Sequence, residues 1–323
     1  MHAAAGQIKI MRGTVPMQRA LKDPTLDPLE MERLLLVERI KDFGEKELGL
    51  APTDNYETVY LGSETNPVYT VTAAHKTRLE LVTWWFPVVG RMPYLGYFDP
   101  EAAADRKQRL EDKGLDVVIW PAEAYSTLGW FQDPVHRNML RKDPVELAET
   151  ILHEMTHATI YVKGQPAFNE TLASVVGKRG ALAFMEAAFG KDSIEAVKAR
   201  AMLRDERRFS EFIKELVSQL TAVYSSTRSD EEKLILREKA FEEAVAGFRD
   251  LEAELETGQF RGFGSGGLNN AHILAVALYH AHYNLFEKVI EAQKGSVSDS
   301  LEIFRMLSEK QGDLITLTKE WVS

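Results

Sequence analysis

Two histidines with a glutamate between them give this sequence its clearest chemical signal. His153 and His157 are four residues apart in the segment His-Glu-Met-Thr-His, and Glu154 follows the first histidine. On a helix, residues at this spacing share one face, with Cβ atoms about 6 Å apart. Two imidazole nitrogens can then bind one zinc ion at about 2.0–2.1 Å. Glu154 would take a proton from a water at the ion and pass it to a leaving amine.

A third ligand is expected, because catalytic zinc sites combine three protein ligands with one open position. Glu170 is our candidate, with twelve residues between His157 and it. That gap holds a helix end, a tight turn and a return, so Glu170 can face the two histidines. The alternative is an ordinary acid in the first turn of a helix, where the helix dipole stabilises negative charge.

The helix that carries the motif has a strong start signal. Asp143 can cap it, and Pro144 suits the first helical position. We expect this helix to continue to about Val162 and to stop at residues 164–166, with the next helix starting near Phe168. The two histidines lie among apolar residues, and a buried His-Glu-His cluster without an ion would be costly. A satisfied histidine pair without a metal is the alternative.

The remaining elements indicate an α+β fold. Helical periodicity and strand-like runs of Thr, Val, Tyr, Trp and Phe alternate in the first 140 residues, whereas the later residues are largely helical. We expect one domain spanning 1–323, with a helix and a small mixed β-sheet in 1–140 and the active-site helix and other helices in 141–323. The expected helices are 27–50, 101–113, several within 181–256, and 270–292; strands are expected within 56–98 and at 116–120 and 124–131, and a glycine-rich loop at 258–267.

Composition narrows the function further. The chain has 323 residues, 45% of them hydrophobic and 27% charged, and a formal net charge of −10. An acidic chain without a basic run is a poor candidate for nucleic-acid binding. The absence of cysteine excludes thiol nucleophiles and cysteine-based zinc sites. No run of 18 apolar residues occurs, so we expect no transmembrane segment.

These motifs together support a resemblance. H-E-x-x-H followed by N-E-x-x-A resembles the gluzincin metallopeptidases, and the chain is most similar to a bacterial family of predicted zinc aminopeptidases. The resemblance implies a zincin-like fold and zinc held by His153, His157 and Glu170, with Glu154 as the base. It is carried by residues 85–90, 94–99, 124–134, 153–157, 168–173 and 269–271, together with Tyr279.

The chain also departs from the best-known gluzincins. Their glutamate ligand follows the second histidine at a longer distance, and some carry an aspartate four residues after it, where this chain has Ser174. The Gly-x-Met-Glu-Asn motif of the large aminopeptidases is absent. These departures bear on exopeptidase specificity more than on the metal chemistry.

Several further residues are candidates for the site. A Tyr or His donor stabilises the carbonyl oxygen in such reactions, and we favour Tyr279 over His280 and His282. Tyr125 and Ser126 are predicted to line the cleft and pair with an extended peptide. Asn169, which precedes Glu170 in the N-E-x-x-A motif, is also predicted to contact the substrate. An acidic anchor for a substrate amine could come from Glu149 or Asp133.

The sequence thus predicts a zinc metallopeptidase that acts on peptides, with an aminopeptidase as the leading hypothesis. An endopeptidase with a narrow protein target is the first alternative, and a non-catalytic zincin-like binding protein is the second. The intact Glu154 argues against the second, because a structural zinc site has no use for a general base. By resemblance we expect the cell envelope or periplasm, after removal of an export segment; the cytoplasm is the alternative.

Overall fold

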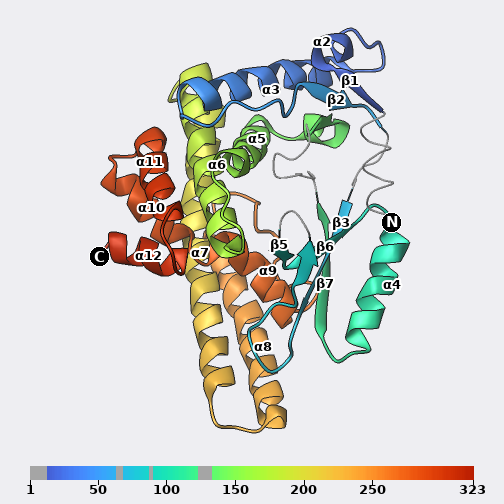
Figure 1. Cartoon of the computed structure of the whole chain (residues 1–323), viewed down its shortest axis with the longest axis vertical. Helices are drawn as coiled ribbons and strands as arrows, with labels where there is room; N and C mark the ends of the chain where they lie inside the picture. The colour runs from blue at the N-terminus through green and yellow to red at the C-terminus, as the bar shows by residue number, and fades with distance from the viewer. Residues whose placement is uncertain (1–12, 63–67, 87–89, 123–132) are drawn as a thin grey trace.

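The computed structural model describes residues 13–62, 68–86, 90–122 and 133–323, and its architecture is α+β as expected. Two antiparallel helices, α5 (Pro144–Thr159) and α6 (Pro166–Phe189), occupy the centre (Figure 1). Most of α6 is buried around its whole circumference, as expected for a helix enclosed by other elements. The other elements pack around this pair.

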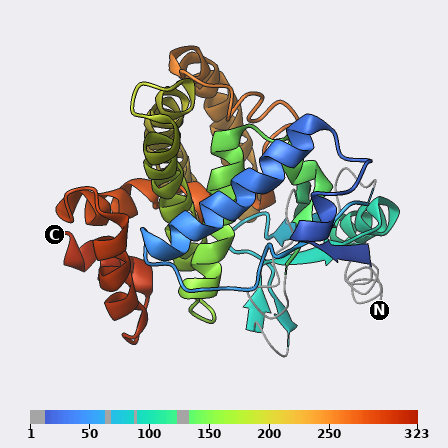
Figure 2. The same ribbon diagram turned by 90° about the horizontal axis from the view of Figure 1, so that it is seen from above.

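The N-terminal part covers one end of the central helices. Helix α3 (Pro28–Lys46) crosses over α5 and α6, which is clearest in Figure 2. Its first turn carries a complete capping box, in which Asp27 and Glu30 bond each other's backbone N–H groups. Beside it lie the short helix α2 (Met17–Ala20), the 3-10 helix η1 (Arg137–Arg141) and a small mixed sheet. That sheet has the order β1 (Thr14–Pro16), β2 (Thr58–Tyr60), β8 (Val135–His136).

A second sheet is antiparallel and lies between two helices. Its order is β6 (Tyr94–Tyr97), β3 (Val68–Ala74), β7 (Asp116–Ala122). Val71 and Val117 on one face pack against α4 (Pro100–Glu111). On the other face, Trp120 contacts His272 of α9 (Asn270–His280). A separate hairpin pairs β4 (Trp84–Phe86) with β5 (Gly90–Met92).

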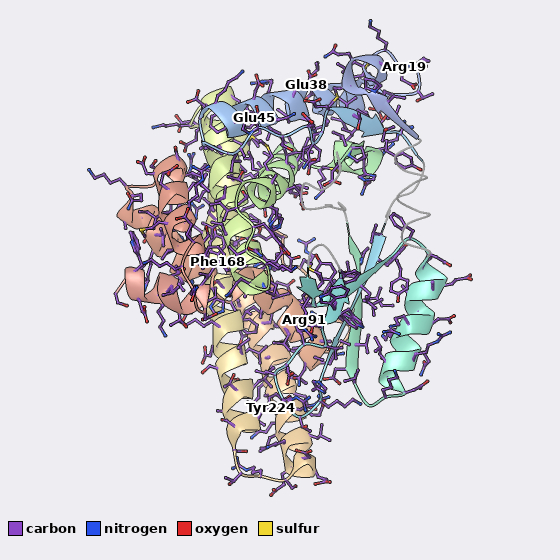
Figure 3. The ribbon with its side chains drawn as sticks, viewed as in Figure 1. Arg19, Glu38, Glu45, Arg91, Phe168 and Tyr224 are labelled. Atoms are coloured by element: carbon purple, nitrogen blue, oxygen red, sulfur yellow. The ribbon has the colours of Figure 1, made fainter. Side chains whose placement is uncertain are left out.

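The C-terminal half is helical. Helices α7 (Ile194–Ser225) and α8 (Asp230–Glu254) form a long pair that extends beyond the rest of the molecule (Figure 1). Helices α10 (Tyr283–Ala292), α11 (Val297–Ser308) and α12 (Leu314–Trp321) cover the far side of α6. There Phe168, labelled in Figure 3, packs against Phe286 and Phe304. None of the helices that the structure describes is both long and apolar enough to cross a membrane.

Three expectations need correction. Helix α5 ends at Thr159 rather than near Val162, because the side chain of Asn169 bonds both backbone groups of Val162. The helix expected over 270–292 is two helices, broken at residues 281–282. The small mixed sheet exists, but the structure also has two antiparallel sheets that are separate from it. The valines of the mixed sheet pack into the main hydrophobic core, whereas β3 and β7 pack into a different cluster with α4. The strand expected at 124–131 lies outside the described residues.

Candidate metal centre

Helix α5 presents the two histidines on one face. The Asp143 side chain accepts a hydrogen bond from the N–H of Val145, and Pro144 occupies the first turn, so the helix starts where the sequence indicated. The rings of His153 and His157 stand nearly perpendicular, with centroids 4.8 Å apart. Their Nε2 atoms are 3.2 Å apart. The local i, i+4 geometry therefore converges two imidazoles on one point.

A short turn after α5 brings Glu170 to the same point. Asn169 is buried, its Oδ1 accepts from the N–H of Val162, and its Nδ2 donates to the carbonyl of Val162, each at 2.9 Å. These two hydrogen bonds hold the turn against the first part of α6. Glu170 then extends from α6 so that its Oε2 lies 3.5 Å from Nε2 of His153 and 3.4 Å from Nε2 of His157.

These three distances form a triangle that suits a small tetrahedral ion. Bonds of about 2.0–2.1 Å in tetrahedral geometry separate neighbouring ligand atoms by about 3.3 Å, and the three edges here are 3.2, 3.5 and 3.4 Å. Two histidines and one carboxylate also form a known donor set for catalytic zinc. Among the described residues, this is the one group of three that could hold a metal ion. The residues present fit zinc in both number and chemistry.

A glycine allows the two central helices to approach closely at this point. A Cβ atom on Gly177 of α6 would lie 2.9 Å from the backbone oxygen of Glu149 and 3.2 Å from Cβ of His153. No side chain fits there without moving one helix. Gly177 therefore sets the spacing between α5, which carries the histidines, and α6, which carries Glu170.

The charges of the cluster favour metal binding. Burial alone would raise the pKa of Glu170, but the two histidines hold that pKa well below its usual range. The carboxylate therefore stays ionised, which is the form that binds a cation. Burial would lower the pKa of His157, and the negative charges of Glu170 and Glu154 outweigh it and raise this pKa. A bound metal ion would supply the positive charge that the carboxylates of Glu170 and Glu154 otherwise favour as a proton on His157.

Glu154 lies next to the ligands but has a different environment. Its Oε2 atom is buried and has no hydrogen-bond partner within the described part of the chain. Such an atom is costly unless it has a functional partner. Tyr56 lies close enough that burial, followed by the charge of Glu154, raises its pKa well above 10. Tyr56 is buried in the left-handed region at φ 65°, an unusual conformation for a large side chain.

Tyr279 comes from far along the chain to the same site. Its ring stacks on that of His153, with centroids 6.1 Å apart and an angle of 24° between the planes. Burial first, and then the charge of Glu170, raises the pKa of Tyr279 well above 10. The phenol therefore keeps its proton and can donate a hydrogen bond. Tyr161 packs edge-on to His157 on the other side, with centroids 6.5 Å apart.

The structure brings together some of the other predicted residues and not others. Asn169 holds the turn before Glu170, and its contact with substrate stays a prediction. Tyr125 and Ser126 lie outside the described residues. Glu149 bonds Lys178 at 2.6 Å, so the proposed amine anchor is already paired.

Of the two histidines weighed against Tyr279, His280 pairs with Glu206, and His282 lies at the break before α10. Sequence reasoning missed Gly177 and Lys178. A glycine inside a helical pattern, and a lysine eight residues after Glu170, were the available signals.

Comparison with known families gives a match over almost the whole chain. Residues 1–313 match the model of a family described as "Putative aminopeptidase". The chain belongs to this family. That description indicates a hydrolase that acts on peptides. No curated protein and no solved structure matches the chain.

Proposed function

We propose that this member of the aminopeptidase family is a zinc-dependent metallopeptidase with a zincin-like active site, and that it removes residues from the N-terminus of peptides. The observation that carries the proposal is the triangle of ligand atoms from His153, His157 and Glu170, with the buried carboxylate of Glu154 beside it. A structural metal site would not need an extra carboxylate next to the ligands.

Each residue has a role that follows from its position. His153, His157 and Glu170 would hold a zinc ion, which would supply a Lewis acid for polarising the scissile carbonyl and acidifying water. Glu154 takes the proton of the attacking water at Oε2 and delivers it to the leaving amine. Tyr279 donates its phenolic proton in a hydrogen bond to the carbonyl oxygen as negative charge develops there.

The choice of an aminopeptidase over an endopeptidase is supported by the family description. Recognition of a free amine would use a carboxylate close to the metal centre. Glu149 is held by Lys178, and we propose Asp133, the other candidate from the sequence, as the anchor. Asp133 is buried, and its backbone carbonyl accepts a hydrogen bond from the N–H of Tyr56. Tyr56 in turn lies close enough to Glu154 that the charge of Glu154 contributes to its raised pKa.

The test measures metal content and hydrolysis in the same preparations. We expect about one zinc per chain in the wild type and in Glu154→Gln, with hydrolysis of aminoacyl amides in the wild type alone. Glu170→Ala should lose both zinc and activity. Glu146→Gln is the matched control, because Glu146 lies on the same helix but is partly exposed and pairs with Lys198. This control should behave like the wild type.

Two results would change the assignment in different ways. A folded wild type that binds no zinc, even when zinc is added, would refute the metallopeptidase. Cleavage of internal bonds in N-terminally blocked peptides, without hydrolysis of free-amine amides, would refute the aminopeptidase and leave an endopeptidase with the same metal centre.

A further inference from the structure

A chain of four charged and polar side chains, two of them buried and two partly exposed, runs beside the metal centre. Nζ of Lys178 lies 2.6 Å from Oε1 of Glu149 and 3.4 Å from Oε2 of Glu206. The other oxygen of Glu206 is 2.5 Å from Nδ1 of His280. The four residues come from α5, α6, α7 and α9, so the chain connects four helices through side chains alone.

Burial makes this network costly to break. Glu206 is fully buried, and Lys178 is 8% exposed. Burial would lower the pKa of Lys178 and raise that of Glu206, but the opposite charges around each group outweigh burial, so both stay ionised. Removing the lysine would leave two carboxylates close together without a cation, which is strongly unfavourable in a dry interior.

The two ends of the network lie next to the site. Glu149 is one helical turn before His153, and Gly177, the residue before Lys178, lies so close that an added Cβ atom would meet both of them. At the other end, His280 follows Tyr279 directly. Successive residues of a helix point about 100° apart, so fixing His280 against Glu206 fixes the rotation of α9 about its own axis. That rotation decides whether Tyr279 faces His153.

Other contacts of α9 lie at its first turn, along its apolar side, where Val276 and Ala277 pack near Phe209, and near its end. Its first turn is held by Asn270, whose N–H bonds Asp116 and whose side chain bonds the backbone of residues 75 and 76. Near its end, the carbonyl of Leu278 accepts from the hydroxyl of Thr171. The ion pair of His280 with Glu206 is a charged contact at this end of α9, and the rings of Phe209 and Phe260 pack edge-on against the same imidazole. Together these contacts fix the direction of His280 and therefore that of Tyr279.

We propose that Glu149, Lys178, Glu206 and His280 form a positioning network that holds Tyr279 over the metal-binding helix. The inference rests on the proposed function for its catalytic consequence, whereas the placement of Tyr279 can be measured without metal or activity. None of the four residues contacts the three ligand atoms through its own side chain. They act through the orientation of α5 and α9.

The placement is measured first, by fluorine NMR on metal-free protein in which the ten tyrosines are replaced by 3-fluorotyrosine. The resonance that disappears in Tyr279→Phe identifies Tyr279. We expect it to shift or broaden in Lys178→Met and in Glu206→Gln. Arg179→Met is the matched control, because Arg179 adjoins Lys178 and is paired at 2.6 Å with buried Glu287, but it faces α10. It should lower stability and leave the resonance in place.

The catalytic consequence is measured by a double-mutant cycle. We expect Lys178→Met to lower kcat at least tenfold in the wild type, with KM changed less than threefold, and to lower kcat less than twofold in a Tyr279→Phe background. A lysine that is merely structural would give additive losses in the two backgrounds.

An unmoved Tyr279 resonance in folded Lys178→Met and Glu206→Gln would overturn the inference, and so would additive kcat losses. If Lys178→Met does not fold, Glu206→Gln decides. A chain that binds no zinc, but in which the resonance shifts as expected, would refute the proposed function and support the network.

Discussion

Gly177 lies where the two central helices touch, and replacing it with alanine should separate the zinc ligands. The added Cβ would lie 2.9 Å from the backbone oxygen of Glu149 and 3.2 Å from Cβ of His153. Ordinary contacts between heavy atoms are about 3.5–4.0 Å, so α6 must move by roughly 0.5 Å. Rotation of a side chain cannot relieve the contact, because one obstacle is backbone.

The displacement acts on the metal centre through Glu170. Glu170 lies seven positions before Gly177, or about two turns, and a helix this well packed moves largely as a unit. Zinc ligands tolerate displacements of only about 0.2 Å. We therefore expect zinc affinity to fall about 10–100-fold, the size of effect seen when the support of a ligand is lost.

The effect on folding without metal is smaller, since two terms oppose each other. Alanine in place of glycine favours a helix by about 1 kcal/mol, whereas overpacking costs about 1–3 kcal/mol. The unfolding free energy of metal-free Gly177→Ala should therefore be about 0–2 kcal/mol lower than that of the metal-free wild type. With saturating zinc, the loss should grow by about 1.4–2.7 kcal/mol, which corresponds to the weaker zinc affinity. Urea unfolding with and without zinc, together with chelator competition, measures both quantities.

Gly247 provides the control for this prediction. It lies in α8, and a Cβ there would meet only the Phe212 ring at 3.9 Å, an ordinary contact. Gly247→Ala should stabilise the protein by about 0.5–1 kcal/mol and leave zinc affinity unchanged. If Gly177→Ala also stabilised the protein and bound zinc like the wild type, the close helix contact would not control the site.

Three further predictions concern other parts of the structure. Asn169→Ala leaves the partly buried N–H and carbonyl of Val162 without the Asn169 side chain as partner, so it should cost about 1–3 kcal/mol and weaken zinc binding, both measured as above. Chelation should lower the unfolding free energy by about 2.7 kcal/mol relative to zinc at 100 times its Kd; an equal stability in both conditions would contradict specific binding. The hydrogen bond from Arg137, followed by that from the N–H of Asp27, lowers the pKa of buried Glu30 below 4.5. The stabilisation that the Glu30 carboxylate provides is therefore complete above pH 4.5 and is lost as the pH falls through the folded pKa. The unfolding free energies of the wild type and Glu30→Gln should differ by about 1–3 kcal/mol near neutral pH. This difference should shrink in unfolding curves measured in acid.

Interactions within a few residues of each other were readable from the sequence. His153 and His157 converge because helical geometry places residues four apart on one face. Asp143 and Pro144 define the start of that helix because capping depends on adjacent backbone groups. The same local rules predicted α3 and α4 and the overall α+β class.

The sequence by itself therefore determined the residues of the candidate metal centre: two histidines on one helical face, a glutamate beside them that we propose as the base, and a candidate third ligand after a turn. Only the tertiary structure decided the spacing and orientation of that centre. Gly177 sets the distance between the helices, Asn169 ends α5 early, and Tyr279 reaches His153 from more than 120 residues away. These features depend on how buried surfaces pack and on where buried charges find partners, and no periodicity within a single segment records either.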